Sequence, residues 1–142
     1  MTRADAYWEH FDHEADIGVR GVGATLAQAF EQAALAMSAV VTPLENIATG
    51  QAVAIACTGD DPEILFVDWL NALVYEMATR NILFGRYSVE IENNKLTATA
   101  WGENVDVQKH QPAVEIKGAT YTALHVTQTA DGQWLAETVV DV

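Results

Sequence analysis

Carboxylates gather near the start of this 142-residue chain at a spacing that suggests a cation site. The segment FDHEADIGVR, residues 11–20, places Asp12, Glu14 and Asp16 at every second position. If the segment were one regular strand, these three side chains would share a face. Like charges held that closely raise each other's proton affinity unless a cation compensates them, and a hard divalent ion bound through oxygen is the simplest compensation.

The end of the sequence adds a second pair of anions. WLAETVVDV places the Asp141 side chain and the terminal carboxylate of Val142 within one residue of each other, directly after a strand-like segment. Two such oxygen anions could complete a metal site. A frayed, solvated terminus is the ordinary alternative.

Conventional catalytic and nucleotide-binding motifs are missing from the sequence. The four histidines have no HExxH spacing, there is no CxxC pair, and neither a nucleophile elbow nor a P-loop occurs. His10 and His13 would point to opposite faces of one strand. The single cysteine, Cys57, has no cationic neighbour in QAVAIACT, so we expect a buried structural thiol and a reducing compartment.

The formal charge of −13, from 20 acidic and 7 basic residues, restricts the partners. It opposes direct nucleic-acid binding, because phosphate contacts need clustered Lys and Arg. Cations or a basic protein fit better, and a solvated acidic surface that aids solubility is the alternative. No apolar run is long enough for a bilayer and the charged start is no signal peptide, so we expect a cytoplasmic protein without membrane contact.

Apolar spacing predicts two main helices. One follows residues 21–41, with Thr25 and Gln28 in the form of a capping box. The other runs from about Pro62 to Thr79, with Asp61 as its N-cap, and its wide apolar stripe is expected in the core.

A period of two predicts strands elsewhere. We expect strands over residues 7–13, 16–22 and 51–58 and hairpins that turn at Asn93-Asn94 and Asp131-Gly132. The pattern indicates one α+β domain over residues 1–142, a two-layer α/β sandwich whose two main helices pack on an antiparallel or mixed sheet.

The segment EIKGATY, residues 115–121, is expected to be a further strand. It would place Glu115 and Lys117 on one face, where an ordinary solvated ion pair is worth ~0.2–1 kcal/mol. Lys117 could instead contact an anionic group on a partner.

In combination, these segments resemble the archease family over nearly the whole chain. The resemblance runs, in order, through FDHEADIGVRGVGATLAQAFEQAALAM, ILFVDWLNALVYEM, Gly102-Glu103, HQPAVEIKGATY and VVDV. It implies an α/β sandwich related to the strand-helix-strand-strand module. It also implies an accessory protein, without enzymatic activity of its own, that activates the RtcB-type RNA ligase. That ligase joins RNA ends in tRNA splicing and RNA repair with GTP and manganese, and the accessory protein would help its guanylylation and repeated turnover.

The resemblance further implies a divalent-ion site formed by Asp16, Asp141 and Val142. Oxygen-only ligands suit Ca²⁺, with Mg²⁺ and Mn²⁺ as alternatives. His13 and Glu14 are expected beside these ligands.

Three residues are expected to contact the ligase: Lys117, His110 and Glu103. The chain departs from the family at two positions. Many relatives have Thr where Glu14 stands, and many have His where Thr122 stands, so this chain lacks that His.

Two other functions remain open. A metal-dependent hydrolase that works alone would use His13 as a general base beside a cation-bound water, next to a deep pocket. An RNA-binding module would need a basic aromatic surface. The tryptophans suit core positions at least as well: Trp8, Trp69, Trp101 and Trp134.

Overall fold

The structure, a computed structural model, describes residues 6–142. The first half of the chain forms β1 (Tyr7–His13), β2 (Asp16–Gly23), α1 (Leu26–Val41), the 3₁₀ turn η1 (Leu44–Asn46), β3 (Gln51–Thr58) and α2 (Pro62–Arg80). The second half forms β4 (Ile82–Glu92), β5 (Lys95–Asn104), α3 (Val107–His110), β6 (Gly118–Ala119), β7 (His125–Gln128) and β8 (Trp134–Asp141). Within residues 6–142, no helix is both long and apolar enough to cross a membrane.

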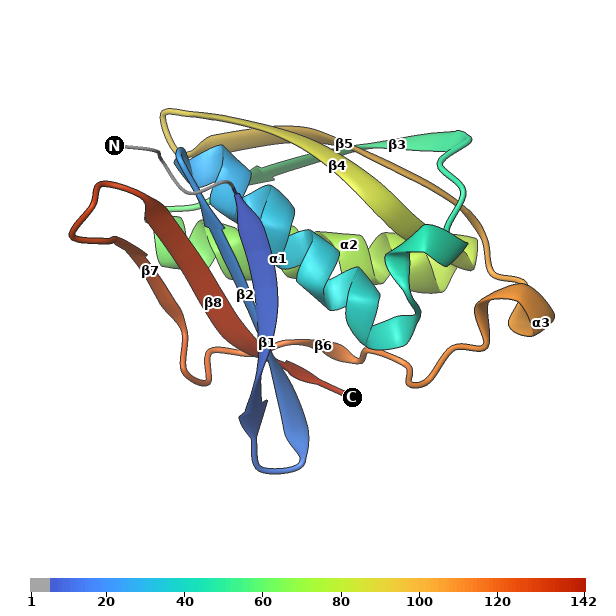
Figure 1. Ribbon diagram of the computed structural model, residues 1–142. Coiled ribbons are helices and arrows are strands. Elements are labelled where there is room, and N and C mark those ends of the chain that lie inside the picture. The colour runs from blue at the N-terminus through green and yellow to red at the C-terminus, as the bar shows by residue number, and fades with distance from the viewer. Residues whose placement is uncertain (1–5) are drawn as a thin grey trace.

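The strands form two antiparallel sheets with α1 and α2 between them (Figure 1). The larger sheet has the order β1-β2-β8-β6, with β7 also paired to β8, and the smaller has the order β3-β5-β4. Helix α1 packs on β2 and β4, one strand from each sheet, while α2 packs on β3 and β6. The α+β class is confirmed. The strands divide into two sheets because α1 has buried residues on several sides and needs cover on both.

Helix α1 begins at the predicted cap. The Thr25 hydroxyl accepts a hydrogen bond from the Gln28 amide at 3.1 Å, and the Gln28 side chain accepts one from the Ala24 amide at 2.8 Å. Gly21 of β2 lies directly against this helix, since a Cβ there would stand 2.1 Å from the Ala29 carbonyl oxygen. Only glycine allows the larger sheet and α1 to approach so closely.

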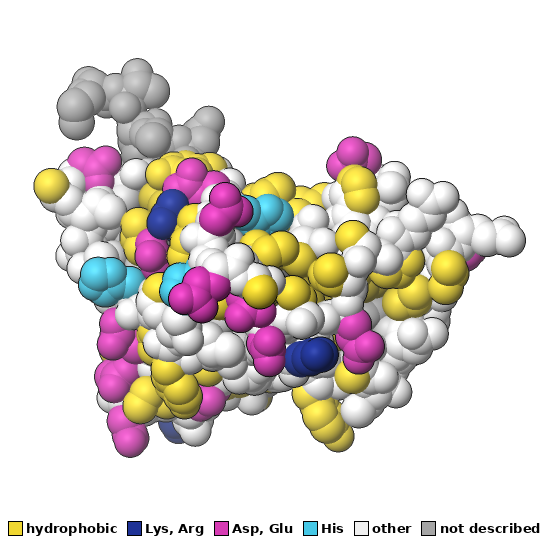
Figure 2. Space-filling view, turned by 90° about the horizontal axis from the view of Figure 1, so that it is seen from below, with side chains coloured by type: hydrophobic (Ala, Val, Ile, Leu, Met, Phe, Trp, Pro, Cys, Tyr) yellow, Lys and Arg dark blue, Asp and Glu magenta, His cyan; other side chains and the backbone are white. Residues whose placement is uncertain are grey.

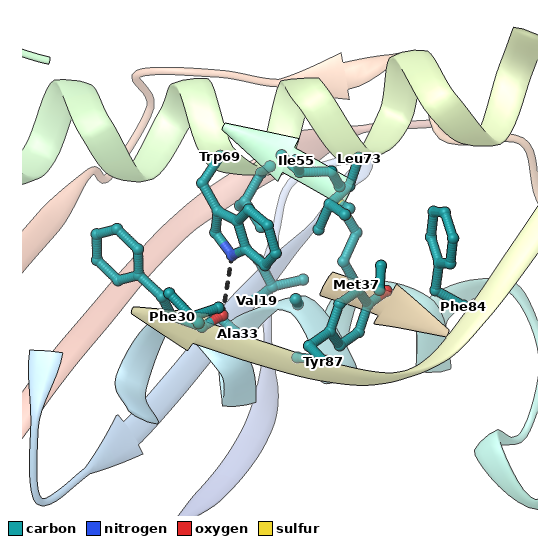
Figure 3. Close-up of a cluster of buried hydrophobic side chains, with 14 of the residues drawn as sticks. Val19, Phe30, Ala33, Met37, Ile55, Trp69, Leu73, Phe84 and Tyr87 are labelled. Atoms are coloured by element: carbon teal, nitrogen blue, oxygen red, sulfur yellow. Dashed lines mark hydrogen bonds between the residues drawn. The ribbon is translucent and has the colours of Figure 1, made fainter. Parts of the chain in front are cut away.

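Helix α2 begins at Asp61, whose carboxylate accepts a hydrogen bond from the Ile64 amide at 2.9 Å, as predicted. Its Trp69 side chain is fully buried and donates a hydrogen bond to the Phe30 carbonyl of α1 at 3.1 Å (Figure 3). The predicted apolar stripe of α2 therefore joins the two helices in the core. Side chains from both sheets complete this core: Val19, Ile55, Phe84 and Tyr87.

Both predicted hairpins are present. Asn93 and Asn94, with φ of 52° and 61°, connect β4 to β5, and Gly132, with φ of 86°, lies in the turn between β7 and β8. Asparagine and glycine are the residues that best tolerate positive φ.

The predicted strand over residues 115–121 is largely wrong. Only Gly118 and Ala119 are in a strand, and the segment before them is attached to a helix end, where the Ala113 amide donates to the Val41 carbonyl at 2.9 Å. Glu115 and Lys117 therefore do not share a strand face, and they form no ion pair with each other in the described structure.

Candidate functional site

The acidic segment near the start of the chain is a hairpin, so its three carboxylates do not share one face. Strand β1 ends at His13, Glu14 lies in the turn with φ of 53°, and Asp16 begins β2 opposite His13. Asp12 is paired with Ile17 instead. Because paired residues share a face and neighbours alternate, Asp12 and Asp16 point to opposite faces. The expectation of a shared face was wrong because the chain reverses within it.

The C-terminal strand returns to the start of β2. Strands β2 and β8 are antiparallel, with Ile17 opposite Val140. The next residues in this register are Asp16 and Asp141. Opposite residues in such a ladder point to the same face with Cβ atoms ~4.5–5.5 Å apart, so the two carboxylates gather at one corner of the larger sheet.

This corner lies on a predominantly acidic face. Figure 1 places the β1–β2 turn and the C-terminus at the same end of the molecule. Figure 2 views the molecule from that side and shows Asp and Glu side chains spread over it, with few Lys or Arg side chains among them. This acidic face fits the net charge of −13.

Strand β6 holds Asp141 from the other side. Gly118 is paired with Asp141, and the Lys117 amide donates to the Asp141 carbonyl at 2.8 Å. Asn71 of α2 in turn binds β6, because its Oδ1 accepts from the Ala119 amide at 2.8 Å and its Nδ2 donates to the Ala119 carbonyl at 3.2 Å. Asn71 thus makes the two hydrogen bonds to the Ala119 backbone that a neighbouring strand would otherwise make. This role was not predicted from the sequence, although Asn71 is a polar residue that interrupts an otherwise apolar part of the helix, which was a signal.

The donor chemistry of the corner suits a hard cation. Asp16, Asp141 and the terminal carboxylate of Val142 are all oxygen donors, the ligands that Ca²⁺ and Mg²⁺ prefer. Asp16 is half-buried and Asp141 is exposed, so an ion can reach both from solvent. No group of three or more His, Cys, Asp or Glu side chains within residues 6–142 is arranged to hold a metal.

Comparison with known proteins identifies the family. A model of the Archease protein family matches residues 8–142. The chain belongs to the archease family. Protein archease from Pyrococcus furiosus is 37% identical over 139 residues, covering 95% of this chain and 98% of the relative. Protein archease from Methanosarcina barkeri is 38% identical over 147 aligned positions, covering 100% of both.

A solved structure supports the fold. The solution structure of Methanobacterium thermoautotrophicum protein 1598 has a TM-score of 0.83 to this chain at 32% identity, and the match covers 95% of this chain and 98% of that one. The archease resemblance found in the sequence is therefore confirmed in family and in fold.

Two of the expected partner contacts belong to an internal polar cluster of this archease. Glu103 Oε2 accepts from Lys109 Nζ at 2.6 Å, from the Ala48 amide at 2.8 Å and from His110 Nε2 at 2.9 Å. Lys109 is the main cause that lowers the pKa of Glu103 to about 2. His110 is 1% exposed and its Nδ1 accepts from the Asp106 amide, so Nε2 carries the proton. The side chain of His110 is thus unavailable to a partner, whereas Lys117 is exposed.

The geometry does not favour the two other functions. A cavity of about 360 Å³ lies between the second half of α2 and residues 105–116, and neither His13 nor Asp16 lines it. A hydrolase would need its pocket beside the metal. The tryptophans within residues 6–142 do not offer RNA an exposed aromatic surface, since Trp69 is fully buried and the other three are half-buried.

Proposed function

We propose that this member of the archease family is an accessory protein that activates an RtcB-type RNA ligase in tRNA splicing and RNA repair. The ligase performs the RNA chemistry with GTP and manganese, while the archease binds the ligase and promotes guanylylation and repeated turnover. Family membership and the acidic charge support this assignment. The observation that carries it is the antiparallel pairing of β2 with β8, in which Ile17 lies opposite Val140 and the next residues in register are Asp16 and Asp141.

Asp16, Asp141 and the Val142 carboxylate hold a divalent cation in this proposal, with Ca²⁺, Mg²⁺ and Mn²⁺ as the suitable ions. The bound ion neutralises the carboxylates and presents a positive centre to an anionic group. His13 lies opposite Asp16 on β1 and Glu14 lies in the adjoining turn, so both are placed to orient the ligands or hold water beside them.

The ligase is recognised by charge. An acidic surface approaches a basic region of the ligase near its nucleotide site, where Lys117 meets an anionic group. The archease then either delivers an ion or favours the ligase conformation that reacts with GTP. The second route requires that the archease bind that conformation more tightly than the alternatives.

A ligation assay tests the accessory role. With limiting RtcB-type ligase, GTP and Mn²⁺, the chain is expected to raise the number of ligated products per ligase molecule, while the chain alone ligates nothing. Asp16→Ala is expected to lose most of the increase. Asp12→Ala is the matched control, because it removes the same charge from the opposite face of the same hairpin. An unchanged product count per ligase with the wild-type chain rules out the accessory role.

Thermal unfolding tests the metal ligands separately. A ligand at 100 times its dissociation constant stabilises the folded state by about 2.7 kcal/mol, so saturating CaCl₂ is expected to raise the melting temperature of the wild type and of Asp12→Ala. Asp16→Ala, Asp141→Ala and deletion of Val142 are each expected to abolish that increase. Retention of the full increase in both aspartate variants would exclude these residues as ligands.

A further inference from the structure

Strand β3 is an unprotected edge of the smaller sheet. The order β3-β5-β4 leaves both outer strands at an edge. Edge strands are usually protected by charge, proline or a bulge. Strand β4 has a register shift after Phe84, and its Val89 amide donates to the Glu31 carboxylate at 2.7 Å. The stretch Ile47–Gly59, which contains β3, has no charged residue and no proline, and its pairing with β5 has no register shift.

The register determines which backbone groups of β3 point outward. Beyond the end of the strand, the Gly59 amide donates to the Asn94 carbonyl at 3.2 Å, in the same register as the β3–β5 pairing. Hydrogen-bonded residues alternate along an antiparallel strand, so the odd-numbered residues bind β5 and the even-numbered ones face the open edge. Four residues face it: Ala52, Ala54, Ala56 and Thr58. All four are exposed and small, so they leave room for another strand.

Helix α2 presents an exposed stripe next to this edge. Ile64 is 37% exposed, Tyr75 is 65% exposed, and Asp68 is exposed. At 100° per residue these three positions fall within an arc of about 40° on the helix. Helix α2 packs on β3, and its Asp68 lies near Cys57 of that strand, because Asp68 is the second cause, after burial, that raises the pKa of the Cys57 thiol.

We propose that the β3 edge binds an extended, basic segment of a partner protein by strand addition. The outward N–H and C=O groups pair with the segment's main chain, which supplies affinity, and its side chains supply specificity. Aliphatic side chains pack on Ile64 and Tyr75, and a Lys or Arg meets Asp68. A second copy of this chain fits poorly, because β3 offers no basic residue to Asp68 and both copies would carry a charge of −13. This surface lies on the smaller sheet, so the proposal is independent of the metal corner.

A titration of the ¹⁵N-labelled full chain with synthetic peptides tests the proposal. The probe is a peptide of about eight residues that alternates Val and Lys. It is expected to shift the amide signals of Ala52, Ala54, Ala56 and Thr58 in a saturable way. A peptide that alternates Val and Glu is expected to bind more weakly, and a Val-Lys peptide with every second amide N-methylated is expected not to bind.

Two variants locate the contacts. Ala54→Pro removes one outward N–H without removing a bond to β5 and is expected to weaken binding about two- to tenfold. Asp68→Asn is expected to weaken binding of the Lys peptide about two- to fivefold. Glu90→Gln makes the same charge change on β4, the other outer strand, and is expected to leave binding unchanged.

Three results overturn the proposal. One is the absence of saturable shifts at these amides up to about 1 mM peptide. Another is equal binding of the Glu and Lys peptides. The third is a concentration-dependent shift of the same amides in the chain alone, which would make a second copy the occupant. If Ala54→Pro does not fold, the N-methylated peptide still tests the main-chain pairing, because that experiment changes the peptide and uses the wild-type protein.

Discussion

Asn71 connects α2 to the strand that borders Asp141, and its removal gives the sharpest test of this architecture. Asn71→Leu keeps a side chain of similar size but loses both hydrogen bonds to Ala119, which leaves a half-buried N–H and C=O without partners. At about 0.5–1.5 kcal/mol for each bond, the expected loss in free energy of unfolding is about 1–3 kcal/mol. For a domain of this length that corresponds to a melting temperature roughly 3–10 °C lower.

Asn71→Asp is the matched variant. It keeps the oxygen that accepts from the Ala119 amide but sets a charged carboxylate oxygen, in place of the donating nitrogen, against the Ala119 carbonyl oxygen, so a loss larger than that of one hydrogen bond is expected. Melting curves measure the global effect, and hydrogen exchange at the Ala119 amide measures the local one, with faster exchange expected in Asn71→Leu. A wild-type melting temperature together with an unchanged Ala119 exchange rate would show that β6 is held by β8 alone.

Two further predictions concern the rest of the chain. Gly21→Ala is expected to lower the free energy of unfolding, measured with denaturant, by about 1–3 kcal/mol or more, because its Cβ would lie 2.1 Å from the Ala29 carbonyl oxygen. Gly50→Ala is the control, since a Cβ there meets nothing within 4 Å. Equal stability of the two variants would contradict the close approach of α1 to the larger sheet. Glu103 has a pKa lowered from 4.5 to about 2 in the folded state, so its contribution to stability is full above pH 4.5 and is lost as the pH falls toward 2. The stability difference between wild type and Glu103→Gln is therefore expected to shrink over that window, and a difference that stays constant with pH would refute the role of the carboxylate.

Local signals accounted for much of the fold. Thr25 and Asp61 cap their helices by short-range hydrogen bonds that the sequence alone encodes, and Asn93-Asn94 has the turn chemistry of a two-residue hairpin. The division into two sheets was not predictable in this way, because strand pairing depends on contacts between residues that are far apart in the sequence. Strand β6 has only two residues, too few for any periodicity to show.

The candidate site was predicted by resemblance rather than by spacing. The spacing of Asp12, Glu14 and Asp16 suggested one carboxylate face, and the turn at Glu14 removes it. Asp141 comes next to Asp16 only because β8 pairs with β2, and no local sequence pattern predicts that pairing. His110 was expected to contact the ligase, yet it is buried, with one ring nitrogen bound to Glu103 and the other to the Asp106 amide.

The position of β8 has a consequence for biosynthesis. Strand β8 lies inside the larger sheet, between β2 and β6, so β2 has only β1 as a neighbour until β8 has left the ribosome. Pairing across more than a hundred residues is slow compared with local helix formation, so a nascent chain exposes a glycine-rich, apolar ladder during this interval. A premature stop that removes residues 134–142 would therefore yield an aggregation-prone fragment rather than a shorter functional protein.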